Sequence, residues 1–278
     1  MTKMSHPTPI SSVFLGTAGW GRKVSKAEAF QILETFYGNG FRWIDTATNY
    51  PIDQNPENYG KTIEWLSDFH SDFPELKVFV KTGSATNLGD PTQLINASYF
   101  ALVFDLLVSQ LGECLGGLGI HWDNGTAVSD RIAVIDFFSN INNRGFAIGL
   151  SGISEPEIYT VSSIAKGLPW IFQANFSPVR LENPILELEQ IRSDFPEAKV
   201  YGYNLLGGIA AKGLLEDGGR LANLNRLINR PTEENSDDIL ERIINRCRTF
   251  NIDGLVIGPT STAQCLDWCR NLDWFHID

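Results

Sequence analysis

Short apolar runs, rich in β-branched and aromatic residues, alternate with longer amphipathic segments from Val13 to the end of the chain. This alternation is typical of repeated βα units, in which a buried strand is followed by a helix that covers it. Two helices are clear: Lys26–Tyr37, which follows Ser25 as a possible N-cap, and Ser236–Phe250. Eight runs have the length and composition of strands: Val13–Thr17, Phe41–Thr46, Lys77–Thr82, Leu115–His121, Ala147–Ser151, Trp170–Ala174, Lys199–Tyr203 and Gly254–Gly258.

No stretch rich in Pro, Gly or Ser divides this series of βα units into two parts. Eight consecutive units therefore predict an α/β protein of the (β/α)₈ TIM-barrel class, with residues 1–278 forming a single domain. A doubly wound open sheet is the alternative, since it is also built from βα units.

Composition narrows the range of partners. The chain has 22 Lys and Arg against 33 Asp and Glu, a formal net charge of -11, which disfavours binding to nucleic acid or to an anionic membrane. No apolar run approaches the roughly 20 residues of a membrane-spanning helix.

The polar N-terminal residues and the four cysteines without a CxxC pair indicate a cytoplasmic protein with free thiols. Cys265 and Cys269 lie four residues apart, but no metal site is expected, and nothing in the sequence predicts the oligomeric state.

Ionisable residues stand at the ends of three predicted strands. Asp45, Lys81 and His121 each close an apolar run, and Tyr50 follows Asp45 on the next loop. In a barrel of this kind the carboxyl ends of the strands meet at one rim, where active sites form. We therefore expect these four side chains to lie together.

This combination suits proton transfer to a carbonyl oxygen. A neighbouring ammonium such as Lys81 favours the phenolate form of Tyr50 and would lower its pKa, while Asp45 would compensate the charge of Lys81. His121 can donate a hydrogen bond to a carbonyl oxygen and polarise it. Each residue alone is more often structural, and the conjunction of the four favours catalysis.

The motifs Asp45-Thr-Ala-x-x-Tyr50, Glu57-x-x-Gly60, Lys81 and Ile120-His121-Trp122 together resemble the aldo-keto reductase family, specifically its short-tailed bacterial members. The resemblance covers nearly the whole chain. It implies an NAD(P)-dependent oxidoreductase that reduces an aldehyde or ketone, or oxidises the corresponding alcohol or lactol, with Tyr50 as general acid/base. A sugar derivative is the expected small-molecule substrate by analogy.

The resemblance also implies a site for NADP(H) or NAD(H). Ser151 and Gln173 would hold the carboxamide of the nicotinamide, and Tyr203 would stack on its ring. The tryptophans Trp20 and Trp122 would line the substrate pocket with Tyr50 and His121. The full set of implied cofactor-binding residues is Gly16, Thr17, Ala18, Asp45, Ser151, Gln173, Tyr203, Asn204, Leu206, Gly207, Gly208, Gly258, Thr260, Ser261, Gln264 and Asp267.

Two departures from the family pattern affect this site. Gly152 stands where many members carry an asparagine beside the serine. The segment Gly258-Pro-Thr-Ser261 is neutral, whereas members selective for the phosphorylated cofactor commonly carry Arg or Lys there. A guanidinium is the usual partner of a phosphate, so its absence weakens the expected preference for NADPH and keeps NADH open.

Two other functions fit parts of the pattern. A regulatory or sensor barrel would bind the cofactor with little turnover. A Schiff-base lyase would use Lys81 as a nucleophile and would need no nicotinamide. The complete set of four catalytic candidates favours the oxidoreductase over both.

Overall fold

A computed structural model of the protein describes residues 10–89, 93–121, 128–152, 167–177, 184–206 and 236–272. In these ranges, eight parallel strands follow one another around a closed barrel, and β8 pairs with β1. This closure confirms the predicted (β/α)₈ TIM-barrel class and rules out the open sheet. The strands are β1 (Val13–Gly16), β2 (Trp43–Ala47), β3 (Lys77–Thr82), β4 (Leu115–His121), β5 (Ala147–Ser151), β6 (Trp170–Asn175), β7 (Lys199–Tyr203) and β8 (Gly254–Ile257).

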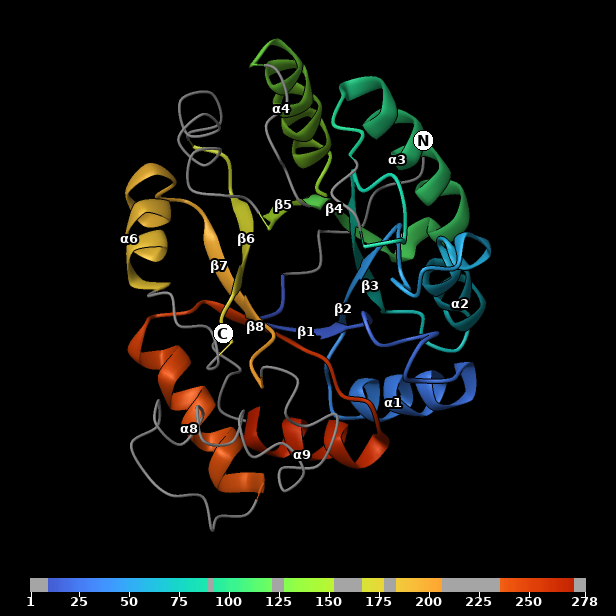
Figure 1. Cartoon of the computed structure of the whole chain (residues 1–278), viewed down its shortest axis with the longest axis vertical. Helices are drawn as coiled ribbons and strands as arrows, with labels where there is room; N and C mark the ends of the chain where they lie inside the picture. The colour runs from blue at the N-terminus through green and yellow to red at the C-terminus, as the bar shows by residue number, and fades with distance from the viewer. Residues whose placement is uncertain are drawn as a thin grey trace.

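Helices surround the barrel, with the strands in the centre of the view in Figure 1. They are α1 (Lys26–Gly38), α2 (Lys61–Phe69), α3 (Ala97–Leu111), α4 (Val128–Asn143), α6 (Pro184–Asp194), α8 (Ser236–Thr249) and α9 (Thr262–Leu272), with short 3₁₀ helices η1 (Pro56–Asn58) and η2 (Gly112–Cys114). None of the helices in the described ranges has the length and apolar character needed to cross a membrane.

Local sequence signals explain where α1 begins. Ser25 accepts a hydrogen bond from the backbone N–H of Glu28, and the Glu28 carboxylate accepts one from the backbone N–H of Ser25, which forms a capping box. This confirms Ser25 as the N-cap. The reciprocal bonds fix the point at which the loop after β1 becomes a helix.

The barrel interior is filled by side chains that point inward from the strands. Phe79 is one of them, and its ring lies against glycines of β4 and β5. A Cβ added at Gly117 or Gly149 would lie 2.7 Å from the Phe79 ring, closer than carbon atoms can approach. The glycines therefore leave the space that the ring occupies, and the interior is a packed core.

Candidate active site

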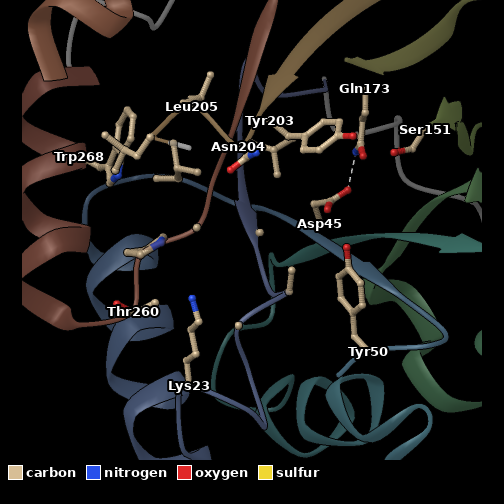
Figure 2. A pocket seen from close by; sticks show the side chains of 18 of the residues that line it. Lys23, Asp45, Tyr50, Ser151, Gln173, Tyr203, Asn204, Leu205, Thr260 and Trp268 are labelled. Atoms are coloured by element: carbon tan, nitrogen blue, oxygen red, sulfur yellow. Dashed lines mark hydrogen bonds between the residues drawn. The ribbon is translucent and has the colours of Figure 1, made fainter. Parts of the chain in front are cut away.

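The four candidate catalytic residues come together at the carboxyl ends of neighbouring strands. Asp45 lies on β2, Lys81 on β3 and His121 at the end of β4, while Tyr50 lies on the loop after β2. All four are buried and line one cavity. Figure 2 shows the Tyr50 hydroxyl pointing up toward Asp45, which lies below Gln173. The strand ends thus bring together residues that are up to 76 positions apart in the chain, from Asp45 to His121.

Asp45 is the centre of the buried polar contacts. Its Oδ2 forms an ion pair with Lys81 Nζ, and both side chains are 4% exposed. Its Oδ1 accepts a hydrogen bond from Gln173 Nε2 on β6, which Figure 2 marks with a dashed line. The carboxylate therefore fixes both the ammonium beside Tyr50 and the amide of a predicted cofactor residue.

Tyr50 has a raised pKa, contrary to the sequence-based expectation that Lys81 would lower it. Burial is the larger cause, because the phenolate loses its hydration, and the negative charge of Asp45 adds to the effect. Lys81 Nζ lies 5.6 Å from the centroid of the Tyr50 ring, but Asp45 compensates its charge. In this arrangement Tyr50 is a protonated phenol at neutral pH.

His121 has a pKa well below its ordinary value, because burial and the nearby Lys81 ammonium both disfavour its protonation. It is thus a neutral imidazole at neutral pH. Its Nδ1 lies 3.5 Å from Ser84 Oγ, and its ring meets the Tyr50 ring edge-on with centroids 5.7 Å apart. A neutral imidazole beside a phenol can donate one hydrogen bond to a substrate oxygen.

The cavity has a volume of about 420 Å³, within the range of small-molecule sites. Most of the predicted cofactor residues lie on its wall. Those that do, besides the four catalytic candidates, are Gly16, Ala18, Ser151, Gln173, Tyr203, Asn204, Leu206, Gly258, Thr260 and Gln264.

Four predicted residues in the described ranges do not line this cavity. Thr17 is fully buried; its hydroxyl donates to the Asp45 backbone oxygen and lies within hydrogen-bond distance of the Thr46 hydroxyl, at 2.9 Å. Trp20 is 1% exposed and packs edge-on against Phe69 on α2. Ser261 directly precedes α9, where its Oγ accepts a hydrogen bond from the Gln264 backbone N–H, and Asp267 lies in the middle of that helix.

Three further predicted residues, Trp122, Gly207 and Gly208, lie outside the described ranges. Gly152 is described, and its φ of +67° favours glycine or asparagine. The local backbone thus accommodates this glycine and would equally accommodate the asparagine that many members carry.

Sequence reasoning missed several residues on the cavity wall. Arg22 and Lys23 are the ones with charge, and they lie on the loop between β1 and α1. The alternation of apolar and polar positions does not reveal which way a loop side chain points. The only sequence signal for these two residues is that they are two adjacent basic residues directly after a predicted strand. The others are Gly19, Leu205, Val256, Ile257, Pro259 and Trp268.

The wall suits a nicotinamide dinucleotide. Near Tyr50 it offers the hydroxyl of Ser151, the amide of Gln173 and the aromatic ring of Tyr203, and Figure 2 shows these on one side of the cavity. Thr260 and Trp268 lie on the opposite side of the view. A Cβ added at Gly258 would meet no atom within 4 Å, so the backbone there borders open space that a phosphate could approach. The chemistry of these groups fits such a ligand.

Metal-binding side chains do not cluster here. Within the described ranges, no group of three or more His, Cys, Asp or Glu residues could hold a metal ion. Cys265 and Cys269 are both buried in α9.

Comparison with known proteins identifies the family. Residues 12–245 match the aldo/keto reductase family, and the chain therefore belongs to it, which confirms the resemblance read from the motifs. Members of this family are oxidoreductases that act on carbonyl compounds. No curated protein matches the chain in sequence.

Two solved structures show the same fold. An aldo-keto reductase from Bacillus halodurans, in its holo form, superposes with a TM-score of 0.70 at 15% identity, covering 97% of this chain and 89% of that chain. An aldo-keto reductase enzyme from a Medee basin deep-sea metagenome library gives a TM-score of 0.63 at 19% identity, covering 96% of this chain and 86% of that chain. At these identities the likeness supports the barrel and not a particular substrate.

Proposed function

We propose that this protein reduces an aldehyde or ketone, or oxidises the corresponding alcohol or lactol, with NADP(H) or NAD(H) as cofactor and Tyr50 as general acid/base. The observation that carries the proposal is the single cavity in which Tyr50, Lys81 and His121 face the same space as Ser151, Gln173 and Tyr203. When bound, the reduced nicotinamide would supply the hydride that forms the new C–H bond.

The chain's own residues would manage the proton and the developing charge. His121, as a neutral imidazole, would donate a hydrogen bond to the carbonyl oxygen and orient it. Tyr50 would then transfer its phenolic proton to that oxygen and later recover a proton from solvent. Its raised pKa keeps it in the protonated form that reduction requires.

The lysine has a supporting role in this proposal. Lys81 is paired with Asp45, and its ammonium would favour the transient negative charge on Tyr50. A Schiff-base lyase would need this amine unprotonated and free to attack a carbonyl. The buried ion pair therefore favours the oxidoreductase over the lyase.

Replacement of Tyr50 tests the proposal. Tyr50→Phe removes the proton donor and leaves the ring, so kcat should fall by about 10²- to 10⁴-fold, while the Kd of the cofactor changes little. The matched control is Tyr37→Phe, which removes a phenolic hydroxyl on α1 away from the cavity. Turnover would be followed as oxidation of NADPH or NADH with a panel of small aldehydes and ketones, and binding by calorimetry.

Two results would contradict the proposal. Full turnover in Tyr50→Phe would remove Tyr50 from the chemistry. Absence of binding by both NADPH and NADH in the wild-type protein would remove the nicotinamide reaction itself. Tight cofactor binding without turnover of any carbonyl compound would instead indicate a regulatory barrel.

A further inference from the structure

Two basic side chains, Arg22 and Lys23, line the cavity but have no part in the proposed chemistry. Both are exposed and lie on the loop that connects β1 to α1. In the part of the chain that the structure describes, neither forms an ion pair with a carboxylate. Glu28, the next carboxylate along the chain, accepts hydrogen bonds from Ser25 instead. The two charges are thus available to a ligand.

The loop holds these residues in a defined place. The Gly19 backbone oxygen accepts hydrogen bonds from the backbone N–H groups of Lys23, at 2.8 Å, and Val24, at 3.2 Å. The Gly21 backbone N–H donates to the Val24 oxygen at 2.8 Å, and the helix cap at Ser25 follows directly. Backbone bonds at both ends therefore position Arg22 and Lys23 beside the cavity.

This loop lies against the loop that follows β8. A Cβ added at Gly19 would be 3.8 Å from Thr260 Cγ2, so the Gly19 backbone lies next to the Thr260 side chain. Figure 2 shows the Lys23 ammonium rising from below toward the space beside Thr260. Lys23 therefore faces the neutral segment at which other members of the family would be expected to carry a cation.

The positions of Lys23 and Tyr50 determine which part of a bound dinucleotide Lys23 can reach. The reacting ring must lie at Tyr50, and Figure 2 shows Tyr50, Gln173 and Ser151 on the opposite side of the view from Thr260, Trp268 and Lys23. A dinucleotide with its nicotinamide at Tyr50 would extend its adenosine toward Thr260. The adenosine of NADP(H) carries a 2′-phosphate that NAD(H) lacks.

Charge supports an anion at this end of the cavity. The cations on the wall are Arg22, Lys23 and Lys81, and the only carboxylate among the described lining residues is Asp45. Asp45 is paired with Lys81, which leaves Arg22 and Lys23 as net positive charge in a protein whose formal net charge is -11. Thr260 adds a hydroxyl, which is held by Gln264 Oε1 at 3.0 Å and can still accept a hydrogen bond.

We infer that Lys23, with Arg22, binds the 2′-phosphate of NADP(H) from the loop after β1, in place of a basic residue after β8. This inference rests on the proposed function, since it assigns the cofactor that the site prefers. The sequence left NADP(H) and NAD(H) both open because the Gly258-Pro-Thr-Ser261 segment is neutral; with cations supplied by the neighbouring loop, the inference is that NADP(H) is preferred.

Binding measurements on the full chain test the inference without any turnover. We expect wild-type protein to bind NADPH more tightly than NADH in calorimetry. Lys23→Met should weaken NADPH binding by about tenfold, because it removes a charge-assisted contact to the phosphate, and the loss is limited by the exposure of this side chain to solvent. NADH binding should stay within about twofold of wild type. Arg22→Met should act in the same direction.

A matched control removes the same charge elsewhere. The control variant is Lys26→Met. Lys26 lies three residues after Lys23, at the start of α1; it pairs with Asp68 on α2 and does not line the cavity. The variant should leave both affinities unchanged. Raising the ionic strength from about 0.01 M to about 0.15 M shortens the Debye length from about 30 to about 8 Å and should reduce the ratio of NADPH to NADH affinity.

Fragments of the cofactor isolate the phosphate from the nicotinamide. Adenosine 2′,5′-bisphosphate should bind wild-type protein more tightly than adenosine 5′-monophosphate, and Lys23→Met should remove most of that difference. An equal loss of NADPH and NADH binding in Lys23→Met would overturn the inference, because the cations would then contact the shared pyrophosphate. Unchanged binding, or a wild-type preference for NADH, would overturn it as well, and in all three cases the proposed function would stand. If wild-type protein bound neither dinucleotide, the proposed function would fail and the inference with it.

Discussion

Removing one charge of the buried Lys81–Asp45 pair should destabilise the fold far more than the pair as a whole stabilises it. Both side chains are 4% exposed, so either charge alone would be left in a poorly hydrated interior. Breaking a buried pair in this way costs about 3–5 kcal/mol. Lys81→Met should lie at the lower end of that range, because Gln173 still donates a hydrogen bond to the remaining Asp45 carboxylate. Asp45→Asn should lie at the upper end, because it leaves the ammonium without the only ion-pair partner that the described residues provide.

The double variant Asp45→Asn/Lys81→Met decides whether this reasoning holds. It removes both charges, so no ion is left uncompensated, and replacing a buried pair by neutral groups is often close to neutral. We expect its loss of unfolding free energy to be no larger than that of either single variant, which corresponds to a coupling at least as large as the greater single effect, about 3–5 kcal/mol. Urea unfolding at neutral pH, followed by tryptophan fluorescence, would give the four free energies. Additivity of the two single effects within about 0.5 kcal/mol would refute the argument, because the charges would then act independently.

Two further predictions concern the barrel interior and the response to acid. Phe79→Ala should lower the unfolding free energy by about 3–5 kcal/mol, because the glycines beside the ring cannot fill the space that the ring leaves. Urea unfolding would measure this loss. A loss below about 1 kcal/mol would show that the interior collapses around the site. His121 has a lowered pKa in the fold, so the unfolded chain binds its proton first as the pH falls, and stability should decrease below about pH 6.5 by at most about 1.4 kcal/mol per pH unit. His121→Asn should reduce this slope in unfolding curves measured between about pH 5 and 8, and an unchanged slope would assign it to other groups.

The fold could be predicted from the sequence because each buried strand appears as an apolar run. Strands β3, β4, β5 and β7 have the predicted bounds, and the others differ by one or two residues at an end. The largest shift is at β2, which begins at Trp43 and not at Phe41. Phe41 is instead stacked on Phe36 of α1, with centroids 4.9 Å apart, and its backbone N–H donates to the Phe36 oxygen. A run of apolar residues does not show which of them pack against a helix before the strand begins.

The catalytic candidates could be predicted for a similar reason. Asp45, Lys81 and His121 lie on strands, and the register of a parallel barrel places strand ends at one rim whatever the loops do. Their electrostatics could not be predicted in the same way. The direction of the Tyr50 pKa depends on how deeply the phenol is buried and on the pairing of Lys81 with Asp45, and both are properties of the assembled site.

The loop after β1 shows where prediction from the sequence ends. Trp20 follows a strand end, as Tyr50 does, and was expected in the substrate pocket, whereas its side chain packs into the core against Phe69. The chain makes a tight turn between Gly19 and Val24, where Trp20 and Val24 form an isolated parallel bridge. This turn buries Trp20 and brings Arg22 and Lys23 to the cavity. Loop residues next to each other in the sequence can therefore lie on opposite sides of the backbone, one in the core and the others at the cavity. The cations that we propose for the 2′-phosphate lie beside β1, whereas the family pattern would place a cation after β8, so the pattern does not point to them.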